Sequence, residues 1–134
     1  MEAARDPVDP DLQPVRVLIA DDEPLFVDSV SALLSNDDRV KVIGTASNGQ
    51  DAVDLASALN PDVTLMDISM PVLDGIEAAR RIRLAIPNAT ILILTGSSIA
   101  ADVDRARQAG VAGFLTKDRI GTQLVSAILE VADR

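Results

Sequence analysis

Short runs of β-branched and aliphatic residues alternate with longer segments of helical period along the chain, and this alternation constrains the fold more than any other feature. Strands that alternate with helices are joined by right-handed crossovers, which makes the strands parallel and covers both faces of the sheet. A barrel needs about eight such units. We therefore predict an open α/β fold, a (βα)5 doubly wound parallel sheet with strands at 15–20, 40–46, 62–67, 89–95 and 111–117.

The segments between these strands carry apolar residues three or four positions apart, as the core-facing side of a helix does. Val30 and Leu34 are examples in the first segment. Pro24, and Asn48 with Asp51 three residues later, are typical of helix starts. Only two of the 134 residues are aromatic, so the core must be packed from Val, Ile, Leu and Ala. A chain of this length forms one domain with a covered parallel sheet.

Residues 1–14 differ from the rest of the chain. They hold three prolines and four acidic residues with almost no apolar periodicity, so they bury too little surface to offset the entropy of ordering. We predict a flexible leader over 1–14 and a folded domain over 15–134, with no output domain in this chain. No apolar run approaches the ~20 residues of a membrane span, and no signal segment opens the chain. We expect no membrane association and a cytoplasmic location.

Charge and missing residue types narrow the chemistry. The chain has 12 basic and 21 acidic residues, a net charge of −9, and no basic stripe, which argues against direct nucleic-acid binding. Cysteine and histidine are both absent, which excludes disulfides, thiolate metal sites, cysteine nucleophiles and histidine-based triads. Carboxylates remain as the candidate nucleophiles and metal ligands.

Polar residues stand where four of the predicted strands end. The first strand leads into Asp21 and Asp22, the third ends at Asp67, the fourth at Thr95 and the fifth at Lys117. Functional sites of open parallel sheets form outside the carboxyl ends of the strands, near the switch in strand order. We therefore expect these side chains to meet at one edge.

The chemistry of this set favours phosphoryl transfer. Three carboxylates in one crevice repel one another, and a hard divalent cation such as Mg²⁺ neutralises them with oxygen ligands. An aspartate is anionic at neutral pH without a base, and aspartyl phosphates are an established covalent strategy. We predict that Asp67 accepts a phosphoryl group with Mg²⁺, while Lys117 and Thr95 bind phosphoryl oxygens.

Four motifs, in this order, resemble the receiver signature of two-component response regulators. They are Asp21-Asp22, LMDISMPVLDG at 65–75, LTG at 94–96 and GFLTKD at 113–118. The resemblance covers roughly residues 15–133 and implies the flavodoxin/CheY-like strand order 2-1-3-4-5. It also implies that the domain catalyses only its own phosphoryl transfer and dephosphorylation, and is otherwise not an enzyme.

The resemblance assigns roles to the acidic residues. Asp67 would be the phosphorylated residue and Asp21 and Asp22 the acid pair. Mg²⁺ would be held by Asp22, Asp67 and the backbone carbonyl of Ser69, with Asp21 reaching it through water. Mn²⁺ would substitute for Mg²⁺.

The resemblance also implies a conformational switch. Thr95 and Phe114 would be the switch pair, and Lys117 the phosphate-binding lysine. Phosphorylation of Asp67 would draw Thr95 inward, repack Phe114 and change the surface of the fourth helix and fifth strand.

The Lys117-Asp118 ending and the VIGTASNGQDAV run at 42–53 resemble the NarL/FixJ type of regulator, which has a LuxR-type output. This implies a sensor histidine kinase as partner, a phosphorylation-dependent homodimer, and control of transcription through a helix-turn-helix domain that alone contacts DNA. The sequence leaves open whether the chain is a fragment or a single-domain regulator. Asp118 stands where many relatives have proline, so a cis bond is not expected on proline grounds.

Simpler interpretations of single residues remain open. Asp21 is also suited to cap the following helix. Lys117 could be a solvated surface lysine, and Phe114 an ordinary core residue. Asp74, before Gly75, favours a turn and helix cap over a metal ligand, so we leave it out of the site.

Three other functions compete with the receiver interpretation. A phosphohydrolase of the haloacid-dehalogenase kind needs a second acid two residues after its nucleophile, where Ser69 stands. A flavodoxin-like cofactor binder needs a phosphate loop after the first strand, where this chain has Asp21, Asp22 and Glu23. A pseudo-receiver would dock partners without being phosphorylated.

Overall fold

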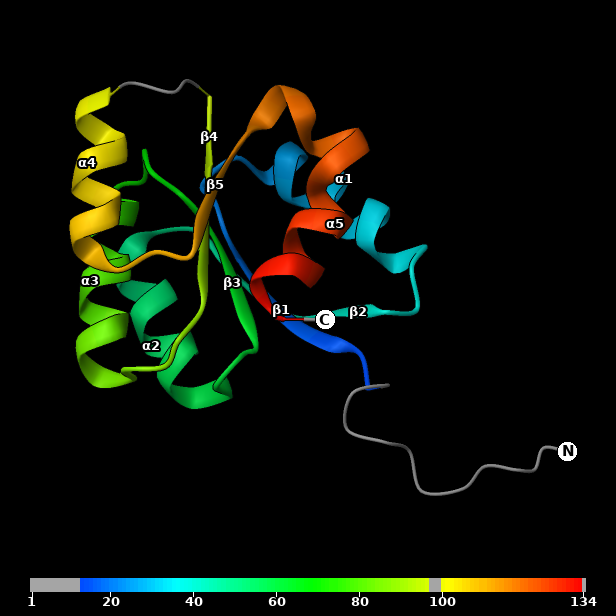
Figure 1. Cartoon of the computed structure of the whole chain (residues 1–134), viewed down its shortest axis with the longest axis horizontal. Helices are drawn as coiled ribbons and strands as arrows, with labels where there is room; N and C mark the ends of the chain where they lie inside the picture. The colour runs from blue at the N-terminus through cyan, green and yellow to red at the C-terminus, as the bar shows by residue number, and fades with distance from the viewer. Residues whose placement is uncertain (1–12, 97–99, 134) are drawn as a thin grey trace, which may run out of the picture.

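A computed structural model describes residues 13–96 and 100–133, which form a five-stranded parallel sheet with helices on both faces (Figure 1). The elements follow the predicted alternation. In chain order they are β1 (Val15–Ala20), α1 (Pro24–Ser35), β2 (Val40–Ala46), α2 (Gly49–Leu59), β3 (Val63–Asp67), α3 (Gly75–Ala85), β4 (Ile91–Thr95), α4 (Ala100–Ala109), β5 (Gly113–Thr116), the short 3-10 helix η2 (Lys117–Arg119) and α5 (Ile120–Val131).

The strand order is β2-β1-β3-β4-β5, which confirms the predicted doubly wound topology. Strand β1 pairs with β2 on one side and with β3 on the other, so the order switches at the carboxyl end of β1. This switch point is where open α/β sheets bind their ligands. The first and third strands therefore bring their terminal residues to neighbouring positions.

The last two strands are shorter than predicted. Pairing of β4 with β3 begins at Ile91, and pairing of β5 with β4 begins at Gly113. The residues before these points are not part of the strands: the Ala89 N–H donates to the Ile86 carbonyl over 2.9 Å, and the Val111 N–H donates to the Ala106 carbonyl over 3.3 Å. Lys117 lies just beyond β5, in η2.

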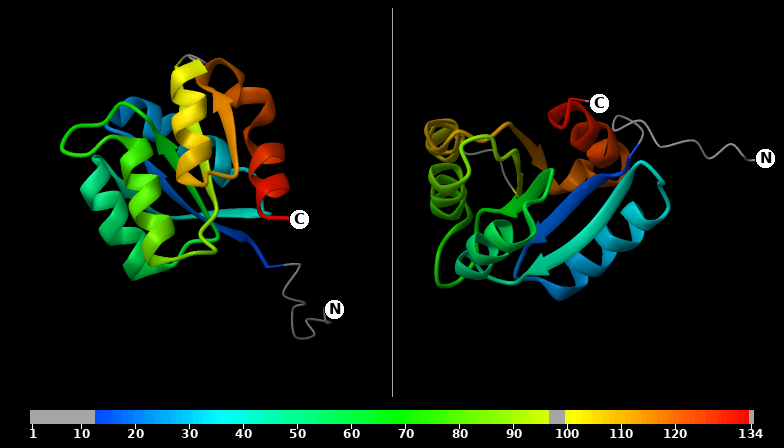
Figure 2. Two further views of the ribbon diagram at one scale, coloured as in Figure 1. Left: turned by 60° about the vertical axis from the view of Figure 1, so that its left-hand side comes forward. Right: turned by 90° about the horizontal axis from the view of Figure 1, so that it is seen from below.

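Each face of the sheet has its own aliphatic core. Figures 1 and 2 show α2, α3 and α4 over one face, and α1 and α5 over the other. Successive strand residues alternate between the two cores, as the pleat requires. The α2–α3–α4 side includes Leu18, Ala20, Met66, Ile76, Ile82, Ile91 and Ile93, and the α1–α5 side includes Val17, Ile19, Val30, Leu34, Leu65, Leu92, Leu94, Leu124 and Ile128.

The predicted helix starts are confirmed. Pro24 occupies the first turn of α1, where its missing N–H is not needed. The Asn48 side chain caps α2 by accepting the Asp51 N–H at 2.8 Å. These local signals fix where the helices begin, and with them the loops that follow the strands.

Residues 1–12 and Arg134 lie outside the described residues, so the flexible leader over 1–14 stays a prediction. Among the helices of the described residues, none has the length and apolar character needed to cross a membrane.

Candidate functional site

Three carboxylates converge at the carboxyl ends of β1 and β3. Asp21, Asp22 and Asp67 each offer one oxygen, and these oxygens lie within 4.8 Å of one another. Asp21 and Asp67 are buried, with 2% and 6% of their surface exposed, whereas Asp22 is exposed. All three donors are hard oxygens, and their mutual repulsion would be relieved by a small divalent cation, so the set fits Mg²⁺.

Lys117 reaches this cluster from the end of β5. Its ammonium donates to Asp21 at 2.8 Å and lies 3.3 Å from Asp67. The side chain is 18% exposed, so the interpretation of Lys117 as a solvated surface lysine is wrong. No peptide bond in the described residues is cis, and the bond from Lys117 to Asp118 is therefore trans.

Burial is the main reason why the pKa of Asp67 rises from its ordinary value of 3.8 to about 6, and the negative charge of Asp21 adds to the rise. The nearby Lys117 ammonium only partly offsets these effects. For Lys117, burial works against the charged form, but hydrogen bonds to Asp21 and Glu23 and the charge of Asp67 outweigh it and raise its pKa. One ammonium thus faces a surplus of negative charge, which favours a bound cation.

The loop after Asp67 folds back tightly on the strand. A Cβ added to Gly75 would lie 1.8 Å from the Asp67 carbonyl oxygen, so only glycine fits there. Val72 has φ of +71°, and the Leu73 N–H donates to the Pro71 carbonyl at 2.7 Å, which forms a strained γ-turn. The Gly75 N–H also donates to the Ile68 carbonyl at 2.8 Å, which closes the loop directly after Asp67.

Thr95 and Phe114 lie on the two neighbouring strands beyond Asp67. Thr95 ends β4 and is 6% exposed, and Phe114 on β5 packs partly buried against the α2–α3–α4 core. A Cβ built on Gly96, the exposed residue after Thr95, would meet no atom within 4 Å. Phe114 also borders a cavity of about 340 Å³, together with Val103 and Val111. Phe114 therefore packs against the core and also borders open space.

A sequence model of the response regulator receiver domain matches residues 17–129, which is most of the chain. The chain belongs to the response regulator receiver domain family. This membership favours the receiver interpretation over the phosphohydrolase and flavodoxin-like alternatives.

Curated relatives of this receiver domain carry different output functions. A transcriptional regulatory protein of Mycobacterium tuberculosis, NarL, is 39% identical over 92% of this chain and 57% of its own length. The transcriptional regulatory protein LnrK of Bacillus subtilis is 35% identical over 87% of this chain and 53% of its own length. The chain thus spans slightly more than half of these relatives. A protein-glutamate methylesterase/protein-glutamine glutaminase of Aliivibrio fischeri is 44% identical over 77% of this chain but only 28% of its own length.

Solved structures support the same family and fold. The signal receiver domain of NarL from Mycobacterium tuberculosis has a TM-score of 0.86 and 39% identity, and the match covers 90% of this chain and 98% of that one. The CheX–CheY–BeF3–Mg²⁺ complex from Borrelia burgdorferi contains a chain with a TM-score of 0.81 and 25% identity, over 88% of this chain and 89% of that one.

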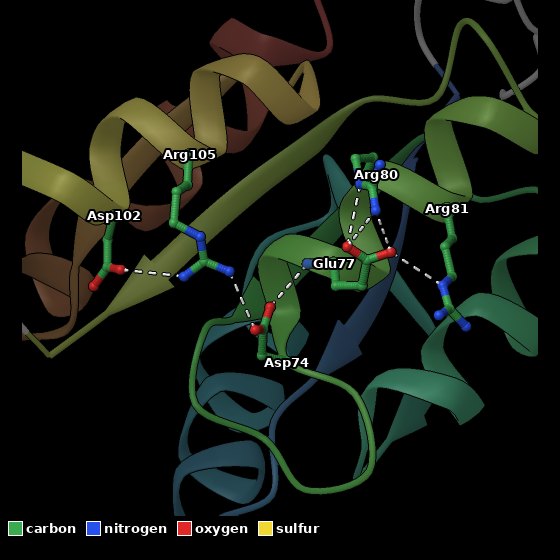
Figure 3. Close-up of polar contacts among 6 residues, drawn as sticks. All are labelled: Asp74, Glu77, Arg80, Arg81, Asp102 and Arg105. Carbon is green, nitrogen blue, oxygen red and sulfur yellow. Dashed lines mark hydrogen bonds and ion pairs between the residues drawn. The ribbon is translucent and has the colours of Figure 1, made fainter.

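Two acidic residues of the receiver domain support its local structure. Asp21 accepts the Glu23 N–H at 2.9 Å, so it forms a turn before α1 as well as contacting Lys117. Asp74 accepts the Glu77 N–H at 2.8 Å as the N-cap of α3, and it forms an ion pair with Arg105 (Figure 3). The prediction that Asp74 is a helix cap is therefore confirmed.

Sequence reasoning missed two residues that contact Lys117. Glu23 lies 3.2 Å from the ammonium, and the ring of Phe26 lies 4.2 Å below it. For Glu23, its place directly after the acid pair was a usable signal. Phe26 gave none, because its spacing is that of a core residue of α1.

Proposed function

We propose that this chain is the phosphoacceptor domain of a two-component response regulator, and that a sensor histidine kinase phosphorylates Asp67 with the help of Mg²⁺. The observation that carries the proposal is the convergence of Asp21, Asp22, Asp67 and Lys117 at one sheet edge in a receiver-family chain. We take the domain as residues 15–134. Receiver domains of two-component systems imply a histidine kinase as partner.

The transfer is an in-line displacement at phosphorus. A carboxylate oxygen of Asp67 forms the new O–P bond while the N–P bond of the donor phosphohistidine breaks, and the leaving imidazole takes up a proton. With a pKa of about 6, Asp67 is largely anionic at pH 7 and needs no base. Lys117 and the Thr95 hydroxyl would donate hydrogen bonds to phosphoryl oxygens as charge develops.

The metal would be held by Asp22, Asp67 and the backbone carbonyl of Ser69, with Asp21 acting through water. Ser69 follows Asp67 by two residues, so its carbonyl is close in sequence to the cluster. The residue is also exposed. When bound, Mg²⁺ neutralises charge on the transferring phosphoryl group, and we expect Mn²⁺ to substitute. The solved Borrelia burgdorferi neighbour is a complex with both Mg²⁺ and BeF3, which supports this assignment.

Thr95 and Phe114 would form the switch. Phosphorylated Asp67 would attract the Thr95 hydroxyl, and Phe114 would repack toward the space that Thr95 vacates, changing the surface of α4 and β5. The cavity of about 340 Å³ beside Phe114 would give its ring room to move. The required shift of a pre-existing equilibrium is only a few kcal/mol.

The output we propose is transcriptional. The match to NarL covers 92% of this chain, and both this relative and LnrK are named transcriptional regulatory proteins. The regulator would contact DNA only through a helix-turn-helix domain, form a phosphorylation-dependent homodimer and act in the cytoplasm. The domain itself would catalyse only its own phosphoryl transfer and dephosphorylation.

Intact-mass analysis after incubation with acetyl phosphate and Mg²⁺ tests the proposal. We expect one phosphoryl adduct on the native chain, none on Asp67→Ala, and an undiminished adduct on Asp54→Asn, which removes an exposed acid of α2 away from the site. Chelation of Mg²⁺ should abolish the adduct. Mg²⁺ binding without any adduct on the native chain would instead indicate a pseudo-receiver.

A further inference from the structure

The ammonium of Lys117 is fully engaged before any phosphoryl group arrives. An ammonium has three N–H donors, and three carboxylates surround this one. Asp21 lies at 2.8 Å, Glu23 at 3.2 Å and Asp67 at 3.3 Å. A phosphoryl oxygen that binds Lys117 must therefore take the place of one of these carboxylates.

Glu23 is the partner that is easiest to displace. Its side chain is 66% exposed, whereas the side chains of Asp21 and Asp67 are 1% and 8% exposed. A displaced Glu23 returns to water at little cost, while a displaced Asp21 would leave a buried charge without its cation. Asp67 stays in place because it is the proposed attacking group.

The position of Glu23 also leaves its side chain free for this role. Glu23 is the N-cap residue of α1, where a side chain often accepts a backbone N–H, but its carboxylate makes no such bond. It contacts Lys117 across 94 residues of sequence instead. From the same helix, Phe26 places its ring 4.2 Å from the ammonium, so the first turn of α1 holds Lys117 from two sides.

We propose that Glu23 is a positioning residue that occupies one donor of Lys117 in the resting domain and is displaced by the incoming phosphoryl group. This inference rests on the proposed function, because it concerns the lysine that would bind the phosphoryl oxygen. Glu23 thereby slows loading of Asp67 without being needed for it.

If Glu23 competes with the phosphoryl group for Lys117 only in the unphosphorylated domain, removing it should change the loading rate and not the decay rate. Loading begins with Lys117 bound to Glu23 and must break that contact, so removing Glu23 lowers the barrier. Decay begins from the phosphorylated domain, in which Glu23 is already displaced, so removing Glu23 leaves the decay rate unchanged. A general change in charge or structure at the site would alter both rates.

The test compares Glu23→Gln, Glu23→Asp and Asp28→Asn. The first variant removes the charge, and the second keeps the charge but shortens the reach to Lys117. Asp28→Asn removes an acid that lines the cavity of about 330 Å³ beside Asp21 and Asp22. Among the described residues, no hydrogen bond or ion pair joins Asp28 to Lys117. Loading from acetyl phosphate, with acetate as the leaving group, is followed by intact mass, and decay after donor removal is followed in the same way.

We expect Glu23→Gln to load about two- to fivefold faster than the native chain, the size that release of one exposed ion pair allows, with the same decay half-life. Glu23→Asp should also load faster, and Asp28→Asn should match the native chain. Equal loading by Glu23→Gln and the native chain, a parallel change in decay, or the same acceleration in Asp28→Asn would each overturn the inference. Absence of any adduct on the native chain would instead refute the proposed function.

Discussion

The carboxyl edge of the sheet and the outer surface of α3 and α4 each hold a polar cluster, and the two differ in burial and in charge balance. At the edge, the side chains of Asp21, Asp67 and Lys117 are 1%, 8% and 18% exposed, and acids outnumber the single cation. On the helices, acids and arginines alternate, and their side chains are 27–58% exposed (Figure 3). The helix cluster consists of Asp74, Glu77, Arg80, Arg81, Asp102 and Arg105.

The difference in burial and charge balance indicates that the edge cluster has a functional role and that the helix cluster consists of ordinary surface ion pairs. Exposed and balanced ion pairs contribute little to stability, because water and salt screen them. A buried cluster with surplus charge lowers the free energy of unfolding, and such clusters are typical of functional sites. Substitutions at the edge should therefore change stability strongly and respond to Mg²⁺, whereas substitutions in the helix cluster should have small effects that respond to salt.

The largest effect is expected for Lys117→Met in the absence of metal. Removing Lys117 leaves the buried carboxylates of Asp21 and Asp67 without their cation, so we expect the free energy of unfolding to fall by about 2–4 kcal/mol. Urea denaturation in EDTA measures this fall, and Mg²⁺ should restore part of the loss. Lys41→Met removes an exposed lysine and serves as the control, with little change expected. Equal losses in the two variants would contradict the contrast between the clusters.

Asp67→Asn should raise the free energy of unfolding, and by less than Lys117→Met lowers it. Because burial raises the pKa of Asp67 from 3.8 to about 6, ionisation of this group opposes folding. The penalty is absent below pH 4, grows as pH rises toward 6 and is complete above it. We expect Asp67→Asn to stabilise the metal-free domain by about 1–2 kcal/mol at pH 7.

Urea denaturation of the native chain and of Asp67→Asn between pH 4 and pH 7.5 measures the difference directly. The stability gap between them should open as pH rises, and Mg²⁺ should close it by stabilising the native carboxylate. A gap that stays constant across this pH range would show that Asp67 ionises with an ordinary pKa.

The sequence predicted the architecture and the edge cluster because both follow from position along the chain. The βα alternation fixes parallel strands, and residues at strand ends must meet at the carboxyl edge. Asp21, Asp67 and Lys117 were found in this way, although Lys117 is 96 residues from Asp21. Local signals also predicted that Asp74 caps α3.

Contacts that depend on the direction of side chains could not be predicted from the sequence. Glu23 lies directly before α1 and Phe26 in its first turn, and only the packing of that helix shows that both reach Lys117. The late starts of β4 and β5 were also missed, because an apolar run does not show where a partner strand begins. The ion pair between Arg105 and Asp74 joins α4 to α3 and left no pattern in the sequence.

Within the helix cluster, Asp74→Ala should have the largest effect. It removes the hydrogen bond from the Glu77 N–H at the start of α3, so we expect a loss of about 1 kcal/mol in the free energy of unfolding. Asp74→Asn keeps an N-cap acceptor but loses the negative charge that faces Arg105, so it should retain most of the stability. Thermal and urea denaturation of both variants separate the two roles. Equal losses would show that the charge, and not the cap, is what Asp74 contributes.

The smallest effect is expected for the ion pair between Asp74 and Arg105. Its atoms lie 3.2 Å apart, and the two side chains are 42% and 50% exposed. A double-mutant cycle that combines Asp74→Asn with Arg105→Gln leaves the N-cap acceptor in place and isolates the charge interaction. We expect a coupling energy of about 0.5 kcal/mol or less at low salt, falling toward zero at about 1 M salt. A coupling above about 1.5 kcal/mol that persists in salt would mean that α4 is held to the start of α3 as firmly as Lys117 is held at the edge. The contrast in burial would then not explain the contrast in energy.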